Sequence, residues 1–360
     1  MSCLSCLLRV FGARRVSAVA AFAAVAMLAA GMTMAQADPV ADFYRGKSIT
    51  IIVSAGAGGG FDTNARMVAR FYGKHIPGHP TILVKNMPGG GHLVAANYLY
   101  NRAPKDGTYL GTLLPAFVSY QVLDGRQVEY DAAKFAWIGA SDVDNMNLYV
   151  WHTTGVTSME GAKKQVLLMG ATGAGSYTEL FPTLMNNLIG TKFKIVSGYK
   201  STNEIHIAME RGEVQGRAGN FFTSLETNNP DWLAEKKINI LMQIGRTRDP
   251  NYKDIPLMTE LATNDDDRRV LAVYSGDVAL GRSFLAPPGV PADRIAALRK
   301  AFDETMADPD FRAEAKKVNM SVRPLNAAEL TDAASEILST PPALIEKAKK
   351  AKLGASEAKK

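Results

Sequence analysis

Cysteine is scarce in this sequence of 360 residues, which has two, Cys3 and Cys6, both close to the start of the chain. We predict below that residues 1–37 are removed, so the remaining chain would contain no thiol. Such a chain forms no disulfide bond and has no thiolate to act as a nucleophile or a metal ligand. Cysteine chemistry is therefore excluded for the segment after residue 37.

Long hydrophobic runs are also lacking. The apolar stretch Val16–Ala30 falls short of the roughly 20 residues that a membrane-spanning helix needs. Three arginines precede it and Ala35-Gln36-Ala37 follows it, a pattern typical of a secretory signal peptide. We predict a signal peptide over residues 1–37, cleavage after Ala37 and export to the periplasm, with an uncleaved anchor as the alternative. No membrane-spanning segment is expected further along the chain.

Neither sign of charge dominates the sequence. It has 41 Lys and Arg and 35 Asp and Glu, a formal net charge of +6. The predicted signal peptide holds three arginines and no acid, so 38 basic and 35 acidic residues remain in the other 323 residues, a net charge of +3. This small charge does not indicate nucleic acid as a partner. A chain of this length usually forms two domains, each with its own core.

Histidine is rare, and its spacing does not indicate a metal site. Of the five histidines, His75 and His79 are separated by Pro77-Gly78, so they do not share one face of a helix. The other histidines have no metal-ligand spacing and no cluster of carboxylates beside them. We therefore expect neither a metal ion nor a cofactor.

The sequence contains no strong signature of catalysis. Ser176 lies in Gly-Ala-Gly-Ser-Tyr, which differs from the G-x-S-x-G turn of the hydrolases. A triad of Ser176, His206 and an aspartate could be assembled, as in any large protein. We therefore expect a protein that is not an enzyme, and keep an exported serine hydrolase acting on a small ester or amide as the alternative.

The pattern that the sequence does contain is an alternation of short β-branched runs and helical segments. Each run is followed by a glycine-containing loop and then by residues with helical spacing, and the region after Pro291 is mostly helical. This order is typical of parallel sheets covered by helices, so we predict an α/β fold with two domains and mainly parallel sheets. The expected strands are 49–53, 81–84, 108–114, 165–169, 193–196 and 238–244.

Three glycine-rich loops follow predicted strands, at Ser54–Asp62, Pro88–Gly91 and Thr172–Ser176. Glycine lets the backbone curl and lets a ligand approach the peptide N–H groups. We expect Asp62 to cap the following helix, whose N-terminus would attract an anion. Ligands of open α/β sheets bind at the carboxyl ends of strands. The candidate ligand-binding residues in these loops are Ser54, Ala55, Gly58, Gly59, Gly60, Asp62, Gly89, Gly90, Thr172, Gly173, Ala174, Gly175 and Ser176.

A dinucleotide-binding fold is the nearest competing interpretation. In the first and third loops, the last glycine of G-x-G-x-x-G is replaced by Phe61 and Thr178. Neither loop has the Gly-Lys-Ser/Thr ending of a P-loop. The dinucleotide interpretation is therefore rejected.

The same segments carry a resemblance to a known family. The sequence resembles the periplasmic substrate-binding proteins of tripartite tricarboxylate transporters, the Bug receptors. The similar segments keep the family's order over nearly all of the chain after residue 37. They are Ile49–Val53 with Gly58–Asp62, Val84–Gly91, Ala103–Tyr109, Ala171–Ser176, Asp254–Pro256 and Phe284–Pro291.

The resemblance implies a clam-shell receptor in which two domains close on a small carboxylate. The first domain would comprise residues 38–146 and 276–360, and the second residues 147–275. The first-strand loop and the Thr172–Ser176 loop would hold the ligand from opposite sides. The implied partners are the carboxylate and the membrane subunits of a tripartite tricarboxylate-type transporter, and we expect a monomer.

One departure from the family changes the expected ligand contacts. Where many relatives read M-F-D-N after a G-x-V-Q strand, this sequence reads Arg217-Ala218-Gly219-Asn220 after Gly212–Gln215. A guanidinium thus replaces a carboxylate near the expected cleft. We add Arg217 and Asn220 to the candidate ligand-binding residues, because arginine binds carboxylates with two parallel hydrogen bonds. The alternative is that Arg217 faces solvent or pairs with Glu213 or Glu226.

Overall fold

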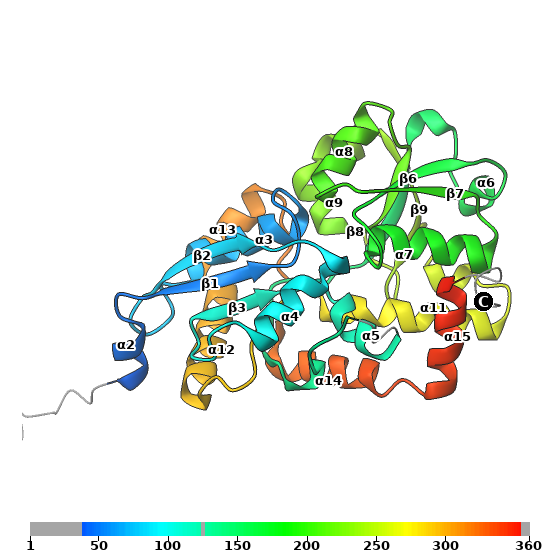
Figure 1. Cartoon of the computed structure of the whole chain (residues 1–360). Helices are drawn as coiled ribbons and strands as arrows, with labels where there is room; N and C mark the ends of the chain where they lie inside the picture. The colour runs from blue at the N-terminus through cyan, green and yellow to red at the C-terminus, as the bar shows by residue number, and fades with distance from the viewer. Residues whose placement is uncertain (1–37, 124–126, 354–360) are drawn as a thin grey trace, which may run out of the picture.

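The computed structural model describes residues 38–123 and 127–353, so the predicted signal peptide lies outside the described residues. The chain forms two lobes, each built on one β-sheet with helices on both faces (Figure 1). We call the lobe of the six-stranded sheet the first lobe and that of the five-stranded sheet the second lobe. The predicted two-domain α/β fold class is confirmed.

The first sheet has the strand order β11-β4-β10-β3-β1-β2. β1 pairs in parallel with β2 and β3, whereas β10 runs antiparallel to β3 and β4, and β11 antiparallel to β4. The register places Val53 beside Asn86 and Thr112, so three strands end at one edge. The strands are β1 (Ser48–Val53), β2 (Thr81–Asn86), β3 (Tyr109–Thr112), β4 (Ala136–Ala140), β10 (Ser283–Ala286) and β11 (Leu325–Asn326).

Helices cover both faces of this sheet because its central strands are apolar on both sides. Five of the six residues of β1 are buried, which explains its continuous β-branched sequence. One face packs against α2 (Pro39–Tyr44), α3 (Gly60–Tyr72), α12 (Ala292–Ala307) and α13 (Pro309–Lys317). The other packs against α4 (Leu93–Asn101), α5 (Ala116–Leu123) and α14 (Ala327–Leu338).

The second sheet has the order β7-β6-β8-β5-β9. β6 is parallel to β7 and β8, and β5 is antiparallel to β8 and β9. Both sheets are therefore mixed: β10 and β11 run against the other strands of the first sheet, and β5 runs against the other strands of the second. The strands are β5 (Met146–Trp151), β6 (Leu167–Ala171), β7 (Phe193–Ser197), β8 (Gly216–Phe221) and β9 (Ile238–Ile244).

The second sheet is also covered on both faces. On one face, an aromatic cluster around Trp232 joins the sheet to α8 (Thr202–Glu210), α9 (Phe222–Asn228) and α10 (Pro230–Ala234). The other face packs against α6 (Met159–Ala162), α7 (Tyr177–Leu184), α11 (Asp265–Gly276) and α15 (Pro342–Leu353). The helix α15 thus brings the C-terminal region back against the second lobe, where Asn187 Nδ2 donates to the Ala351 carbonyl at 2.7 Å.

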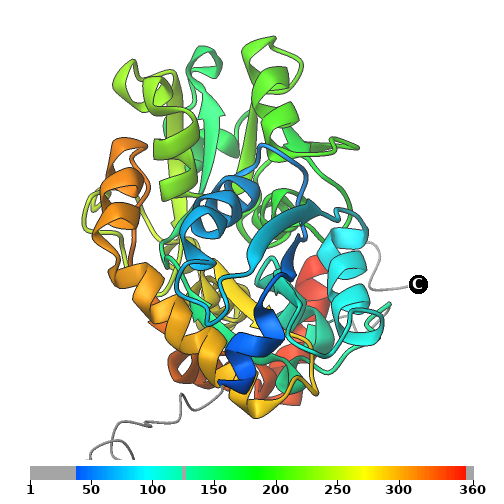
Figure 2. The same cartoon turned by 90° about the vertical axis from the view of Figure 1, so that its left-hand side faces the viewer.

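Figure 2 shows the second lobe, in green, above the first. Two segments connect the two sheets, and their backbones are hydrogen-bonded to each other. Residues 141–145 join β4 to β5, and the segment after α11 returns to β10. Ser141 N–H donates to the Arg282 carbonyl at 3.1 Å, and Arg282 N–H donates to the Asp142 carbonyl at 2.9 Å. The strands of the first sheet therefore come from two separate stretches of the sequence, whereas the second sheet is continuous in sequence.

The sequence placed one strand of the site wrongly. We expected Gly212–Gln215 to form a strand with Arg217 at its end, but β8 runs from Gly216 to Phe221. Val214 precedes β8 and packs with residues of α8, while Arg217 is the second residue of the strand. Arg217 therefore lies inside the sheet and is buried, with 1% of its surface exposed. It neither faces solvent nor pairs with Glu213 or Glu226, so the alternative interpretation of this residue is wrong.

Candidate functional site

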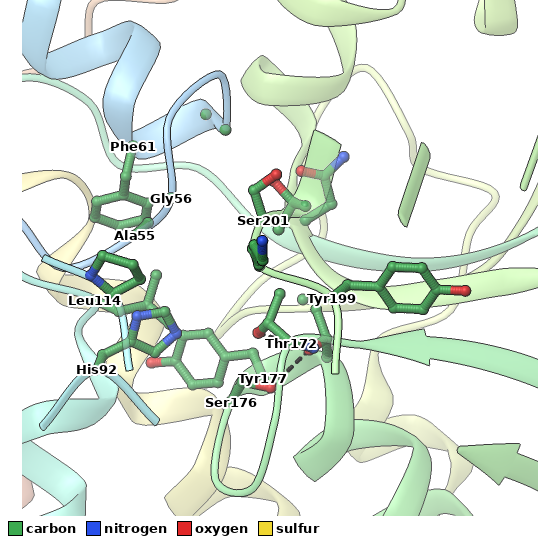
Figure 3. A pocket seen from close by; sticks show the side chains of 18 of the residues that line it. Ala55, Gly56, Phe61, His92, Leu114, Thr172, Ser176, Tyr177, Tyr199 and Ser201 are labelled. Carbon is green, nitrogen blue, oxygen red and sulfur yellow. Dashed lines mark hydrogen bonds between the residues drawn. The ribbon is translucent and has the colours of Figure 1, made fainter. Parts of the chain in front are cut away.

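A cavity of about 370 Å³ lies between the two lobes. Its walls come from loops at the carboxyl ends of strands in both sheets, where the topology predicts a ligand. Figure 3 shows Phe61 and His92 of the first lobe facing Thr172 and Ser201 of the second. The lining residues are Ala55, Gly56, Gly59, Gly60, Phe61, Pro88, Gly89, Gly91, His92, Leu114, Thr172, Ser176, Tyr177, Thr178, Gly198, Tyr199, Lys200, Ser201, Thr202, Arg217, Gly219, Asn220, Phe221 and Ser224.

Eight of the predicted ligand-binding residues line this cavity. They belong to both lobes: Ala55, Gly59, Gly60, Gly89, Thr172, Ser176, Arg217 and Asn220. The other predicted residues lie near it without forming its wall: Ser54, Gly58, Asp62, Gly90, Gly173, Ala174 and Gly175. The three glycine loops therefore meet at one place, as their positions after strands predicted.

Several residues of the second group shape the loops. Ser54 is buried, and its Oγ accepts a hydrogen bond from Leu114 N–H at 2.9 Å. A Cβ on Gly91 would lie 2.6 Å from the Ala174 carbonyl oxygen, so these two glycine loops touch across the lobes. These residues therefore position the loops that form the cavity walls.

Asp62 does not cap α3 as we expected. Gly59 is the N-cap and makes no side-chain capping bond, while Asp62 lies inside the first helical turn. Its carboxylate accepts hydrogen bonds from Gly58 N–H (2.9 Å), Arg66 Nε (3.0 Å) and Asn86 Nδ2 (2.9 Å). Burial acts to raise the pKa of Asp62, but the bonds from Arg66, Gly58 and Asn86 outweigh it and lower the pKa. Asp62 thus braces the loop as a carboxylate turned away from the cavity.

Four helices begin at the cavity wall. Gly60 and Phe61 open α3, His92 precedes α4, Tyr177 and Thr178 open α7, and Thr202 opens α8. The N-caps of α3, α4 and α7 make no side-chain capping bond, so N–H groups of these first turns lack that partner. Each helix N-terminus carries a partial positive charge, and their convergence favours an anion.

Arg217 adds a full positive charge to the same cavity. Its guanidinium is buried, and Nη1 lies 3.0 Å from His206 Nε2 while Nη2 donates to the Gly219 carbonyl at 3.4 Å. Its Nε has no hydrogen-bond partner. No ion pair joins Arg217 to an acid of the described residues, although an arginine side chain stays protonated in proteins. A buried charge of this kind is unfavourable unless something pairs with it.

The contact with Arg217 fixes the protonation state of His206. Since a guanidinium can only donate, His206 Nε2 must accept and is therefore unprotonated. The Tyr149 hydroxyl lies 2.8 Å from the same nitrogen, and Asn220 Nδ2 donates to that hydroxyl at 3.3 Å. Burial, followed by the charge of Arg217, lowers the pKa of His206 well below its usual value. The imidazole is neutral and leaves the charge of Arg217 uncompensated.

The sequence interpretation missed one loop of the site, Gly198–Thr202. This loop follows β7 and leads into α8, whose N-cap Ser201 accepts from Glu204 N–H at 3.2 Å. A strand, a glycine and a capping serine before a helix would have indicated it, by the rule used for the other loops. The aromatic walls, Phe61, Tyr177, Tyr199 and Phe221, were also missed because core packing explains such residues equally well in sequence.

The geometry does not assemble the serine triad of the alternative interpretation. Ser176 Oγ donates to the Gly173 carbonyl at 2.7 Å and lies 2.6 Å from Thr178 Oγ1. His206 contacts Arg217 and Tyr149 instead. The ring of His92 is directed to the Ser54 carbonyl, 2.7 Å from Nδ1. Thus, within the part of the chain that the structure describes, no serine hydroxyl at this cavity is hydrogen-bonded to a histidine ring.

Within residues 38–123 and 127–353, no group of three or more His, Cys, Asp or Glu side chains is arranged to hold a metal ion. In the same ranges, none of the helices has the length and apolar character required to cross a bilayer.

Comparison with known proteins gives a consistent result. No protein-family model matches the sequence. A UPF0065 protein of Cupriavidus necator is 24% identical over 341 residues, which cover 90% of this chain and 94% of that protein. UPF0065 proteins are assigned to the Bug family. The resemblance to the Bug receptors is confirmed.

Two solved structures show the same fold. The periplasmic binding protein BugD superposes with a TM-score of 0.68 at 20% identity, covering 86% of this chain and 98% of its own. MatC from Rhodopseudomonas palustris, with bound malate, superposes with a TM-score of 0.64 at 20% identity, covering 83% of this chain and 99% of its own. At this identity the comparison shows the fold, and the function has to be argued from the cavity.

Proposed function

We propose that this protein is a periplasmic solute-binding receptor that captures a small carboxylate between its two lobes and delivers it to a tripartite tricarboxylate-type membrane transporter. The observation that carries the proposal is the charge of the cavity. Four helix N-termini and one buried, unpaired guanidinium converge on it, and none of its lining residues is an acid. The malate-bound relative supports a carboxylate as the ligand class.

In this proposal one carboxylate meets the N–H groups at the start of α3, and a second acidic group meets Arg217. The first contact uses Gly59 and Gly60, and the second is flanked by Asn220 and Thr172. A charge-assisted hydrogen bond contributes about 1.5–3 kcal/mol. Several of them, less the ordering costs of closure, suffice for the roughly 8 kcal/mol of a micromolar receptor.

Capture requires the lobes to open and close. The domains would be residues 38–146 with 276–360, and residues 147–275, joined by the two crossing segments. The loop of Gly56 lies against Lys200 of the second lobe, so ligand entry requires these loops to separate. Closure would create a surface that the membrane subunits can distinguish from the open state. The receptor acts as a monomer and makes or breaks no bond.

Calorimetry and thermal unfolding with a panel of carboxylates test this function. Ligand at about 100 times its Kd should stabilise the protein by about 2.7 kcal/mol. A serine hydrolase would instead release product from small esters or amides and would react with a serine-directed probe. Product release, or no stabilisation by any carboxylate, contradicts the proposal. Export is tested separately, since the exported protein should begin at Asp38.

A further inference from the structure

The cavity has an unusual charge balance for a site that holds small biological acids. Many such acids are amino acids, and burying their ammonium group requires a carboxylate or a full set of acceptors. Here no acid lines the cavity, and two acids that lie close in sequence to its loops are bonded to other groups. Asp62 is bonded to Gly58, Arg66 and Asn86, and Glu204 Oε2 accepts from Lys200 N–H at 2.8 Å.

We propose that the cavity selects its ligand by charge: it accepts carboxylates that have no ammonium group, and the imidazole of His206 beside Arg217 sets this preference. The inference rests on the proposed function and narrows it, because amino acids become poor ligands. His206 is a positioning residue, acting through Arg217.

The argument depends on what His206 provides and what it does not. It gives Arg217 Nη1 an acceptor at 3.0 Å, which holds the guanidinium in place inside the sheet. A carboxylate at this position would hold it equally well but would neutralise it. The imidazole accepts the same hydrogen bond without a negative charge, so the full charge of Arg217 acts on the cavity.

The residues around His206 and Arg217 do not neutralise the charge of Arg217. The other side chains hydrogen-bonded in this group, Tyr149 and Asn220, are both uncharged. Trp232 packs against the His206 ring, with centroids 4.8 Å apart, and excludes solvent from that side. An ammonium group in the cavity would thus meet a buried guanidinium and helix N-termini, with no counter-charge in the wall.

Binding of matched ligand pairs to the purified protein tests whether the cavity prefers carboxylates that have no ammonium group. Each pair differs in a hydroxyl or an ammonium group: lactate and alanine, malate and aspartate, 2-hydroxyglutarate and glutamate, phenyllactate and phenylalanine. For the pair whose size fits the cavity, titration calorimetry should give an affinity for the hydroxy acid that is at least about 100-fold higher than that for the amino acid. This difference is expected because the ammonium charge of the amino acid would be buried without a counter-charge.

Two variants of one residue test the role of His206. His206→Gln keeps an uncharged acceptor and should keep the preference, whereas His206→Glu places a carboxylate on Arg217 and should reduce the preference by at least about 10-fold. Circular dichroism and thermal unfolding verify that both variants fold. If His206→Glu does not fold, Tyr149→Glu places the carboxylate beside the same guanidinium and gives the same expected loss.

The outcomes separate the two proposals. If a hydroxy acid and its matched amino acid bind the wild type with equal affinity, the proposed selection against ammonium groups is overturned, while the proposed receptor function stands. A preference that His206→Glu or Tyr149→Glu leaves unchanged would overturn the role of His206. If no member of any pair, nor any other carboxylate, binds the wild type, the proposed function itself fails.

Discussion

The proposed function depends most directly on Arg217, whose buried charge should bind the ligand. A buried, unpaired charge lowers the stability of the ligand-free protein, and replacing such a group by an apolar side chain of similar length is often stabilising. A structural arginine would behave in the opposite way, because its removal would leave its partners unsatisfied. Stability and binding therefore distinguish the two roles.

We predict that Arg217→Met abolishes most of the binding without lowering stability. The affinity for the best carboxylate should fall at least about 30-fold, since truncating one member of a buried charge pair costs about 2–5 kcal/mol. The midpoint of ligand-free thermal unfolding should be unchanged or higher. Arg211→Met is the control, because Arg211 is exposed and lies 3.9 Å from Glu213. If Arg217→Met strongly lowers the midpoint of ligand-free unfolding but binds the carboxylate with wild-type affinity, Arg217 has a structural role and does not bind the ligand.

The place of Arg217 beside the cavity could be predicted from the sequence, but its surroundings could not. The departure from the family pattern at this position predicts a guanidinium near the cleft. Its neutral partner, His206, lies eleven residues away on a different element. The contact between them depends on how α8 packs on β8, which no local pattern encodes. The same holds for Tyr149, on a strand that we did not predict.

At the scale of elements, the loops that follow strands decide whether the lobes can close. Gly56 lies in the first-lobe loop, and a Cβ on it would be 2.6 Å from the Lys200 carbonyl oxygen of the second lobe. This neighbour is backbone and cannot turn aside as a side chain can. The first lobe alone places no atom there, so the obstruction acts on closure and leaves folding unaffected.

We predict that Gly56→Ala folds normally but binds ligand more weakly. Overpacking of this kind costs about 1–3 kcal/mol, which corresponds to about 5- to 150-fold in affinity. Calorimetry should show the loss, while thermal unfolding of the ligand-free variant should match the wild type. Ala57→Ser is the matched control, because Ala57 is exposed in the same loop. Wild-type affinity in Gly56→Ala would show that ligand binding does not bring these loops together.

The elements also show which patterns the sequence can reveal. β1, a buried parallel strand, and β9, which is antiparallel to β5, were predicted closely, because both are largely apolar runs. β4 and β5 were missed, since they contain Gly139 and Asn147 and lie together on either side of a short crossing. β8 was displaced because its sequence, Gly-Arg-Ala-Gly-Asn-Phe, has no apolar alternation. Burial of that strand comes from its neighbours in the sheet.

At the scale of the whole molecule, the two crossing segments are held by Asp142, which is buried and contacts two arginines, the buried Arg282 and the partly exposed Arg323. Arg282 Nη1 pairs with Asp142 at 3.2 Å, and Arg323 Nε contacts the other oxygen of Asp142 at 3.1 Å. Arg282 Nη2 also donates to Ser224 Oγ, which lines the cavity, at 2.5 Å. These contacts connect one crossing segment directly to Ser224 in the wall of the ligand site.

A second buried acid, Asp277, lies at the end of the return crossing. It accepts a hydrogen bond from Ser119 Oγ of α5 at 2.7 Å. Burial raises the pKa of Asp277 to about 7, and hydrogen bonding by Ser119 and the nearby Tyr177 hydroxyl offsets this only in part. The folded protein therefore holds a proton on Asp277 in a pH range where the unfolded chain, with a pKa of about 4 for aspartate, has lost it.

The sign of the resulting pH dependence follows from this difference. Because the pKa is raised on folding, the contribution of Asp277 to stability falls as pH rises from about 4 to 7 and stays low above that range. Asp277→Asn removes the titration, so the variant should gain about 2–3 kcal/mol relative to the wild type between pH 5 and pH 8. The lowered pKa of His206 produces the opposite slope, but it is present in both proteins and cancels in the comparison. Denaturant unfolding at both pH values measures the difference, with Asp254→Asn, an exposed aspartate, as the control. A difference between Asp277→Asn and wild type that is the same at pH 5 and pH 8 would show that Asp277 is ionised in the folded protein.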